Sequence, residues 1–385
     1  MRDTADVVVI GGGVIGASVA YHLASRGCTD VRVLERDAGP GGGSTGRATG
    51  GFRVQFGSEV NVRLSLLARE KLLRFQDETG VDSGYRPHGY LFLAEDAASM
   101  DGLAAARAVQ HAAGATQPRP VTPSEAREIN PALDTDGVIG GAWCPIDGFI
   151  RPLQMLRGYT EGAGRLGVRF DYGVAAGGFR TDGGRITAVR TDEGEIACGA
   201  VVNAAGAWAA EVARLAGVEI PVRPLRRQVA CTEPTDVLPE TMPLTVFLGD
   251  GFHTRVRDGR VLLLLPDQPA DPESLSFRDE WLAGVTASAH RHLPCLRDVP
   301  VDRGASWCGL YEMSPDDHVL LGVAAGIENL YLANGSSGHG VMHSPALGHL
   351  LAEIILDGAA DTLDVHALRP SRFDEGDPVR AVEFW

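Results

Sequence analysis

Short apolar runs alternate with helical patterns at the start of the chain. The run 7–10 is strand-length and bounded by glycine, which is typical of a buried parallel strand. Val19 and Leu23 then lie four residues apart on one face of a predicted helix, which Gly27 is placed to end. A second apolar run at 31–34 predicts another strand. The order strand, helix, strand predicts an α/β fold that opens with a βαβ unit.

The rest of the chain continues this alternation, with more β structure in its second half. Helical spacing and capping residues predict helices over 59–79, 101–114, 122–130, 152–166 and 278–292. Strand and turn patterns predict β structure over 89–94, 137–149, 168–172, 174–201, 221–265, 301–322 and 330–333. Ser344-Pro345 has the form of an N-cap followed by a first-turn proline, and it predicts the start of a final helix that Gly358 ends.

A glycine turn joins the first strand to the first helix. Gly11, Gly13 and Gly16 satisfy G-x-G-x-x-G, with Val14 and Ile15 opening the helix. Gly11 allows the tight turn, Gly13 lets the backbone approach a diphosphate, and Gly16 lets the helix pack on the strand. The diphosphate would then bind helix N–H groups at the positive end of the helix dipole. The alternative is a glycine-rich turn that binds nothing.

The second strand ends at an acidic residue, Glu35, followed by Arg36. A carboxylate at this place can accept hydrogen bonds from ribose hydroxyls and would repel a 2′-phosphate. The βαβ unit therefore favours FAD or NAD over NADP.

Three further small-residue segments are candidate parts of a cofactor site. The loop 39–51 could lie along the cofactor, although a mobile surface loop is the alternative. The turn near 205–208 can press against the first glycine loop, and the loop 338–342 opens a helix whose N–H groups could face a developing negative charge. The candidate contacts are Ser44, Thr45, Arg47, Ala48, Thr49, Gly50, Gly51, Ala205, Gly206, Trp208, Gly338, His339, Gly340, Val341 and Met342.

Composition narrows the class of protein. A chain of 385 residues with 44% hydrophobic content predicts one large or two interleaved domains. Its net charge of −15 argues against nucleic acid or an anionic membrane as a partner, but local arginines could still bind an anionic small molecule. No apolar run reaches the length of a membrane span, and we expect no signal peptide. Six cysteines without metal-site spacing suit a reduced, cytoplasmic protein with no metal.

Several stretches resemble the D-amino-acid oxidase and sarcosine oxidase class of flavoproteins. They are DVVVIGGGVIGASVAYHLASRG with VRVLER, then VVNAAGAWA, WCGLYEMSPDDH and GSSGHGVMHSPALGHLLAEIILDG. Within this class, GGFRVQFGSEVNVRLS and GAWCPIDGFIRP are most similar to sarcosine oxidase β-type and proline dehydrogenase β-type chains. The resemblance spans nearly the whole chain, in the family's order.

The resemblance implies a Rossmann-type FAD-binding domain of the glutathione-reductase-like kind and a substrate domain. The first would comprise 1–85, 150–217 and 315–385. The second would comprise 86–149 and 218–314 around a mixed, largely antiparallel sheet. Hydride would pass from the carbon next to an amine to flavin N5, and the imine formed would hydrolyse. Val174 and Ala175 would contact adenine, the 338–342 loop would lie at the flavin's pyrimidine edge, and Gln228 and Tyr311 would lie towards the substrate.

Two departures from the family pattern qualify these expectations. Monomeric sarcosine oxidases attach FAD to a cysteine where this chain has Gly309, so we expect non-covalent FAD at this position, with neighbouring Cys308 as the alternative attachment point. Those oxidases also use a lysine matching about 262–264 to activate oxygen and another matching Met342, whereas Lys71 is the only lysine here. A dehydrogenase that passes electrons to another carrier therefore becomes plausible beside an oxidase.

The substrate candidates follow from the charge of an amino acid. A carboxylate needs a fixed cation, and arginine binds it through two N–H groups, which makes Arg53 and Arg255 candidates. His253 and Tyr311 could orient the amine or hold it neutral. Each of these residues could instead have a purely structural role.

The leading prediction is an FAD enzyme that oxidises a small amino or N-methylamino acid such as sarcosine, proline or glycine. Oxygen or another electron acceptor would be its second partner. A non-catalytic FAD-binding assembly subunit and an NAD-linked reductase are the alternatives. The oligomeric state, homo- or hetero-oligomeric, stays open.

Overall fold

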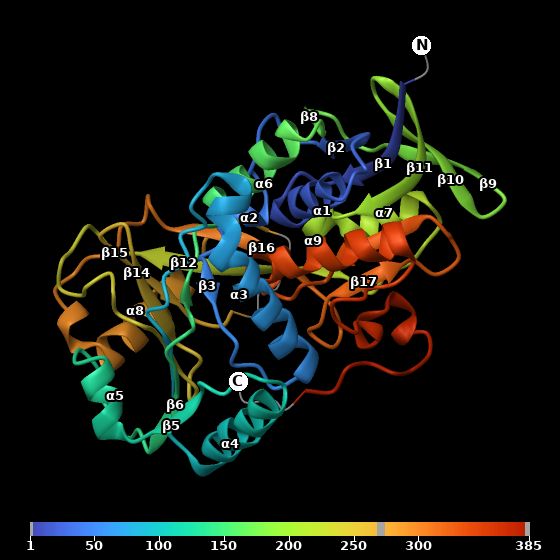
Figure 1. The fold of residues 1–385 in the computed structure, drawn as a ribbon. Helices are drawn as coiled ribbons and strands as arrows, with labels where there is room; N and C mark the ends of the chain where they lie inside the picture. Colours follow the sequence, from blue (N-terminus) through green and yellow to red (C-terminus); the bar gives the residue numbers. More distant parts are fainter. Residues whose placement is uncertain (1–2, 268–273, 382–385) are drawn as a thin grey trace.

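Two eight-stranded mixed sheets form the framework of the chain (Figure 1). The computed structural model describes residues 3–267 and 274–381. The first sheet contains, in spatial order, β17 (Leu320–Val323), β18 (Leu330–Asn334), β11 (Gly194–Asn203), β1 (Asp3–Ile10), β2 (Val31–Glu35) and β8 (Arg169–Tyr172), with β10 (Arg185–Thr191) paired to β11 and β9 (Gly178–Asp182) paired to β10.

The second sheet is built from later segments of the chain and is largely antiparallel. It contains, in spatial order, β16 (Trp307–Met313), β12 (Arg223–Cys231), β15 (Arg260–Leu264), β14 (His253–Arg257), β13 (Leu244–Phe247), β4 (Tyr90–Ala94), β6 (Gly140–Cys144) and β5 (Arg119–Val121). Among the described strands of this sheet, β13 and β4 form the one parallel pair. The short strands β3 (Gly51–Phe52) and β7 (Gly148–Phe149) form a separate antiparallel pair.

Helices surround both sheets. The α-helices are α1 (Val14–Ser25), α2 (Ser44–Arg47), α3 (Glu59–Thr79), α4 (Ala97–Ala112), α5 (Pro123–Ile129), α6 (Pro152–Arg165), α7 (Ala209–Leu215), α8 (Asp279–His292) and α9 (Gly340–Asp357). Short 3₁₀ turns cover Gly206–Trp208, Pro294–Leu296, His366–Leu368 and Pro370–Arg372. Among the residues that the structure describes, no helix combines the length and the apolar character needed to cross a membrane.

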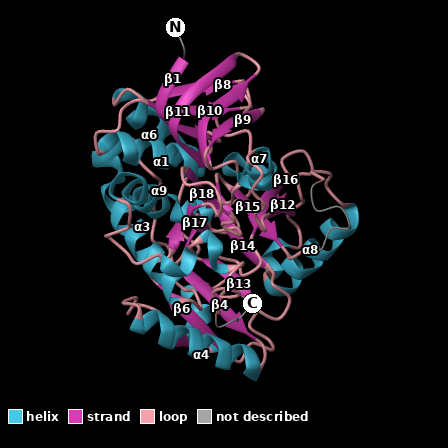
Figure 2. Ribbon diagram, turned by 90° about the vertical axis from the view of Figure 1, so that its right-hand side faces the viewer, coloured by secondary structure: helices cyan, strands magenta, loops and turns pink. Residues whose placement is uncertain are grey.

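Strand β1 lies at the centre of the first sheet, parallel to β11 on one side and β2 on the other. Its side chains alternate: Val7 and Val9 join the core formed with the large helices, whereas Val8 and Ile10 join the core under α7 and the β9–β10 hairpin. Figure 2 shows α6, α1, α9 and α3 together on one side of these strands. The predicted βαβ opening is therefore confirmed, with a core on each face of its sheet.

Close packing of α1 on α9 depends on small residues. A Cβ on Gly348 would lie 2.2 Å from Ser18 Oγ, so only glycine permits this approach. Ser18 Oγ donates to the Ser344 carbonyl at 2.7 Å across the same contact. The two helices thereby fix their N-termini relative to each other, which matters for the site described below.

The last helix begins earlier than its sequence pattern predicts. Helix α9 starts at Gly340, with His339 as its N-cap, and Pro345 lies inside it. Proline removes the N–H that would bind the Val341 carbonyl, and Ser344 Oγ donates to that carbonyl at 2.8 Å instead. The prediction of Ser344 as the N-cap is therefore wrong, because its hydroxyl repairs a gap within the helix. The predicted end at Gly358 is confirmed, with φ of 85°.

Each of the two large sheets falls within one of the two predicted domains. The strands of the first sheet fall within 1–85, 150–217 and 315–385, and those of the second fall within 86–149 and 218–314. Residues 1–2, 268–273 and 382–385 of these ranges lie outside the described residues. We keep the boundaries as a proposal.

Candidate cofactor and substrate site

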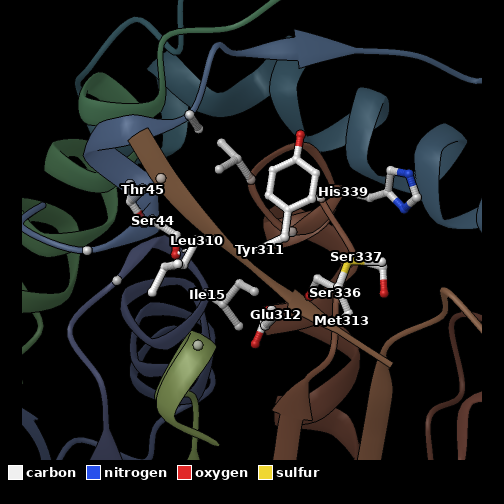
Figure 3. Close-up of a pocket in the computed structure, with 18 of the residues that line it drawn as sticks. Ile15, Ser44, Thr45, Leu310, Tyr311, Glu312, Met313, Ser336, Ser337 and His339 are labelled. Carbon is white, nitrogen blue, oxygen red and sulfur yellow. Dashed lines mark hydrogen bonds between the residues drawn. The ribbon is translucent and has the colours of Figure 1, made fainter. Parts of the chain in front are cut away.

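A single cavity of about 1370 Å³ extends from the first glycine turn to the second sheet (Figure 3). It is lined by residues of β1, α1, β2, the loop after β2, β12, β14, β16 and the start of α9. All of the predicted cofactor contacts line it except Gly16. Gly16 is instead needed for packing, because a Cβ there would lie 2.0 Å from the Gly11 carbonyl oxygen. The topology thus brings segments more than 300 residues apart in the chain to one space.

The N-terminus of α1 opens into one end of the cavity. Gly11 has φ of 108° and packs so tightly on the next turn that a Cβ would lie 2.3 Å from the Ala204 carbonyl oxygen. The N-cap residue, Gly13, provides no capping side chain, and the first turn of α1 contains no acid. The Val14 N–H donates to Thr45 Oγ1 at 3.1 Å. The positive end of the helix dipole, with no acid in the first turn, suits an anion such as a diphosphate.

The end of β2 provides the acidic and aromatic part of the same region. Glu35 accepts from the Gly12 N–H and the Asp37 N–H, each at 2.9 Å, which fixes its carboxylate beside the glycine turn. The Arg36 guanidinium lies 3.6 Å from the centre of the Trp208 ring. Val174 and Ala175 line the cavity nearby in the wall that follows β8. This composition suits a ribose and an adenine ring.

The loop 39–51 is tied to the second sheet by hydrogen bonds. It contains α2, and Ser44 Oγ donates to the Leu310 carbonyl at 2.7 Å, which ties the loop to β16. The Trp307 indole donates to the Arg47 carbonyl at 2.8 Å. The loop therefore lies between the two sheets as a wall of the cavity.

Arg255 has a different place from the one that the sequence suggested. It is absent from the cavity lining among the described residues. Its Nη1 donates to the Thr49 and Gly50 carbonyls at 2.8 Å each, and its guanidinium lies 3.7 Å from the Phe149 ring. Arg255 thus holds the loop 39–51 in place. This position does not favour the direct contact with substrate that the sequence suggested.

The N-terminus of α9 forms the opposite end of the site. His339 is its N-cap residue without a capping side-chain bond, and its first turn carries no acid. Gly338 has φ of 90°, and a Cβ there would lie 2.5 Å from the Tyr311 ring. The glycine therefore allows the loop to pack against Tyr311, whose side chain projects from β16 beside His339 (Figure 3).

Arg53 is a buried cation in the cavity wall. It follows β3, and its guanidinium lies 4.3 Å from the centre of the Phe56 ring. Burial lowers its pKa to about 10, so it stays charged at neutral pH. A buried guanidinium of this kind is suited to binding a carboxylate, because the low-polarity surroundings strengthen the interaction.

His253 and Tyr311 are neutral polar groups on the same wall. Burial lowers the pKa of His253 to about 4, and its Nδ1 contacts the Gly251 carbonyl at 3.0 Å. Nδ1 must carry the hydrogen to bind a carbonyl, so Nε2 is the unprotonated nitrogen. Burial raises the pKa of Tyr311, so its hydroxyl is protonated. The two residues can accept from and donate to an amine.

Gln228 lies at this end of the cavity as well. Its side chain donates to Asp267 Oδ2 at 2.8 Å and accepts from the Arg278 N–H at 2.8 Å. Both ends of the amide are therefore engaged by protein groups. This arrangement indicates a supporting part of the wall.

Two buried oxygens test whether the site suits FAD. Glu312 Oε2 and Ser336 Oγ line the cavity and have no hydrogen-bond partner among the described residues. Gly340 lies between Ser336 and Ile15. A Cβ added to Gly340 would lie 3.0 Å from Ser336 and 3.1 Å from Ile15. Ser336 thus lies between the N-termini of α1 and α9, and Glu312 of β16 lines the same cavity. Hydroxyl groups would give both oxygens partners, so the residues present fit this cofactor.

Cys308 of β16 lies outside the described cavity lining. It is buried, and its Sγ contacts Gln228 Oε1 at 3.9 Å. Gly309 instead faces the cavity beside Arg47. Burial raises the pKa of the Cys308 thiol, which lowers its reactivity. This orientation supports non-covalent FAD.

Sequence reasoning missed four residues of the site. Tyr90, Arg227 and Glu312 line the cavity, and buried Asp147 accepts from the Val54 N–H at 2.7 Å behind Arg53. Tyr90, Arg227 and Glu312 lie on strands, where alternation separates the two faces but does not identify the cavity face. For Asp147, the acid in GAWCPIDGFIRP, the sequence did carry a signal of a site residue, because a lone carboxylate between apolar segments is unusual.

Comparisons with known proteins agree with this geometry. The profile of the family described as DAO, FAD dependent oxidoreductase, matches residues 6–354. L-proline dehydrogenase from P. horikoshii is 30% identical in sequence and superposes with a TM-score of 0.92 over 98% of this chain and 100% of that one. Glycine oxidase from Geobacillus kaustophilus, at 23% identity and a TM-score of 0.85 over 96% and 99% of the two chains, shares the fold.

Curated relatives are similar at about the same level. FAD-dependent oxidoreductase domain-containing protein 1 of Xenopus laevis is 29% identical over 98% of this chain and 84% of its own. 4-Methylaminobutanoate oxidase of Paenarthrobacter nicotinovorans is 29% identical over 95% of this chain, and rat dimethylglycine dehydrogenase is 29% identical over 97% of it. The chain spans 45% of each of these two longer proteins.

Proposed function

Because the chain belongs to the family of FAD-dependent oxidoreductases, we propose that it oxidises the C–N bond of a small amino or N-methylamino acid. It is an FAD-binding flavoprotein, and sarcosine, proline and glycine are the candidate substrates. One observation carries the proposal. A single cavity joins a dinucleotide-binding βαβ unit to Arg53, His253 and Tyr311.

Each of these residues has a distinct part in the proposed reaction. Arg53 binds the substrate carboxylate and so fixes the α-carbon over the cofactor position. His253 accepts a hydrogen bond from the amine through Nε2, and Tyr311 helps to orient it. Since both are neutral at pH 7, they favour the neutral amine, whose lone pair is needed as hydride leaves the adjacent carbon. Bound FAD supplies the hydride acceptor, and the imine product then hydrolyses.

A dehydrogenase is the favoured version of this proposal. Lys71, the only lysine, is absent from the described cavity lining, and burial on α3 lowers its pKa. Monomeric sarcosine oxidases use a lysine to activate oxygen, and the described cavity lining contains none. The electron acceptor proposed here is therefore a carrier other than oxygen. The cytoplasmic location remains a prediction that rests on the six cysteines, all of which are free.

Anaerobic absorbance spectroscopy of the purified holoprotein tests the proposal. Sarcosine, L-proline, glycine and dimethylglycine are added in turn, and at least one is expected to bleach the flavin. Turnover with oxygen is then compared with turnover with an artificial dye, which is expected to be faster. Equal rates would overturn the dehydrogenase version. A flavin that no amine reduces would favour a non-catalytic assembly subunit.

Acid precipitation tests the mode of FAD attachment. All flavin is expected in the supernatant, both for the wild type and for Cys308→Ser. Flavin that stays with the wild-type pellet and leaves that of Cys308→Ser would assign Cys308 as the attachment point.

A further inference from the structure

Arg227 places a second cation beside the proposed substrate site. It lies on β12 opposite Gly309 of β16 and diagonally from Tyr311, so its side chain shares the cavity face of that strand pair. Its guanidinium lies 5.5 Å from the centre of the Tyr311 ring. It lines the cavity together with Arg53.

Among the described residues, the contacts of Arg227 are with carbonyl groups and not with carboxylates. Nη1 donates to the Asp267 carbonyl at 2.9 Å and the Arg226 carbonyl at 3.4 Å, which fixes the direction of the side chain. Within 3–267 and 274–381, no carboxylate forms an ion pair with it, and no hydrogen bond involves its Nε or Nη2. Asp267 instead pairs with Arg226 on the opposite face of β12, at 3.3 Å.

The charges of Arg227 and Arg53 change the pKa values of the same two residues, His253 and Tyr311. Each of the two guanidiniums lowers the pKa of His253, and each opposes the rise that burial causes in the pKa of Tyr311. His253 and Tyr311 therefore lie within electrostatic reach of both cations. Two like charges that flank one largely buried space repel each other, and a ligand with two negative groups would offset both.

We propose that the substrate is an amino acid with a second carboxylate, and that Arg227 binds that carboxylate while Arg53 binds the one next to the amine. The proposal rests on the proposed function for the identity of the site. It narrows the substrate class from small amino acids to amino dicarboxylic acids and their N-methyl derivatives. Arg227 is then the residue that determines specificity, because arginine recognises a carboxylate through two parallel N–H groups.

Binding of non-reacting acids to the oxidised holoprotein tests this directly. Succinate and butyrate have the same number of carbon atoms but carry two and one carboxylates, and their Kd values are measured by isothermal titration calorimetry. We expect succinate to bind at least 10-fold more tightly than butyrate. Arg227→Gln should bring the ratio close to one, and Arg227→Lys should restore part of it. Arg223→Gln, on the same strand but outside the described cavity lining, is the matched control and should keep the wild-type ratio.

Equal affinities in the wild type, or a ratio that Arg227→Gln leaves unchanged, would overturn the inference. Flavin reduction separates its failure from that of the proposed function. If sarcosine bleaches the flavin but succinate and butyrate bind equally well, amine oxidation stands. The proposal that the substrate carries a second carboxylate is then refuted. Suppose instead that succinate binds much more tightly than butyrate, but neither sarcosine nor N-methyl-L-aspartate reduces the flavin. The second-carboxylate site would then stand, and amine oxidation would be refuted. Faster reduction by N-methyl-L-aspartate than by sarcosine, reversed in Arg227→Gln, would support both.

Discussion

Nη2 of Arg53 lies 3.4 Å from Nε2 of His339. A guanidinium can only donate, so His339 accepts through Nε2 and carries its hydrogen on Nδ1. Burial lowers the pKa of His339 well below its ordinary value of 6.5, and the positive charge of Arg53 is the second largest cause of this shift. The contact joins the segment after β3 to the N-cap of α9, so the proposed carboxylate-binding cation and the proposed flavin-binding loop fix each other.

Replacement of His339 is expected to weaken substrate binding through Arg53. His339→Phe removes the acceptor, and because a hydrogen bond to a charged group contributes about 1.5–3 kcal/mol, KM should rise roughly 10- to 100-fold. His339→Gln keeps an acceptor and should recover most of the affinity. Steady-state kinetics with the substrate found by flavin reduction measure both, with exposed His366→Phe as the control. An unchanged KM in His339→Phe would contradict the coupling.

Asp147 is expected to make stability depend on pH. Burial raises its pKa from 3.8 to about 7, so the folded protein holds the proton more tightly than the unfolded chain does. This contribution is fully present below pH 3.8 and is lost as the pH rises to about 7, by at most about 4 kcal/mol. Asp147→Asn should therefore show a smaller fall in unfolding free energy than the wild type between pH 5 and 7.5.

Urea unfolding at several pH values measures this difference. Buried Glu312, whose pKa burial raises from 4.5 to about 7, acts in the same direction, so Glu312→Gln should remove a second share of the slope. Identical pH slopes in the wild type and both variants would show that neither carboxyl is protonated in the folded state.

Gly11 is expected to tolerate no side chain. In Gly11→Ala the new Cβ would lie 2.3 Å from the Ala204 carbonyl oxygen, a backbone atom that cannot move aside cheaply. We expect a loss of stability of at least about 3 kcal/mol together with loss of bound FAD. Gly27→Ala is the matched control, because its φ of 96° is similarly unfavourable but nothing lies within 4 Å. It should cost about 1–2 kcal/mol and keep FAD, as thermal unfolding and the flavin content would report.

Ser344 and Pro345 are expected to be energetically coupled. Ser344→Ala leaves the partly buried Val341 carbonyl without its donor and should cost about 1 kcal/mol. Pro345→Ala restores a backbone N–H for that carbonyl, so Ser344→Ala should cost less in this background. A double-mutant cycle by urea unfolding measures the difference. Additive effects would mean that the Ser344 hydroxyl does not replace the missing bond.

The sequence by itself determined the local architecture of this protein. The spacing of Gly11, Gly13 and Gly16, the acid at Glu35 and the helix stop at Gly27 depend on contacts within about thirty residues, which a pattern can encode. The predicted helix start at 122 is equally local, and Thr122 and Glu125 form a capping box there. The family resemblance extended these local signals to the whole fold and to FAD.

Only the tertiary structure decided which face of each strand meets the cavity. Arg227 lies beside Tyr311 because β12 pairs with β16 across about eighty residues, and a shift of one residue would have turned it away. Arg255, equally basic in the sequence, lies outside the described cavity lining and binds carbonyls of the loop 39–51 instead. Asp147 and Glu312 acquire their high pKa values from burial, which depends on segments far apart in the chain. Local spacing fixes elements, but register and desolvation arise only when the elements pack together.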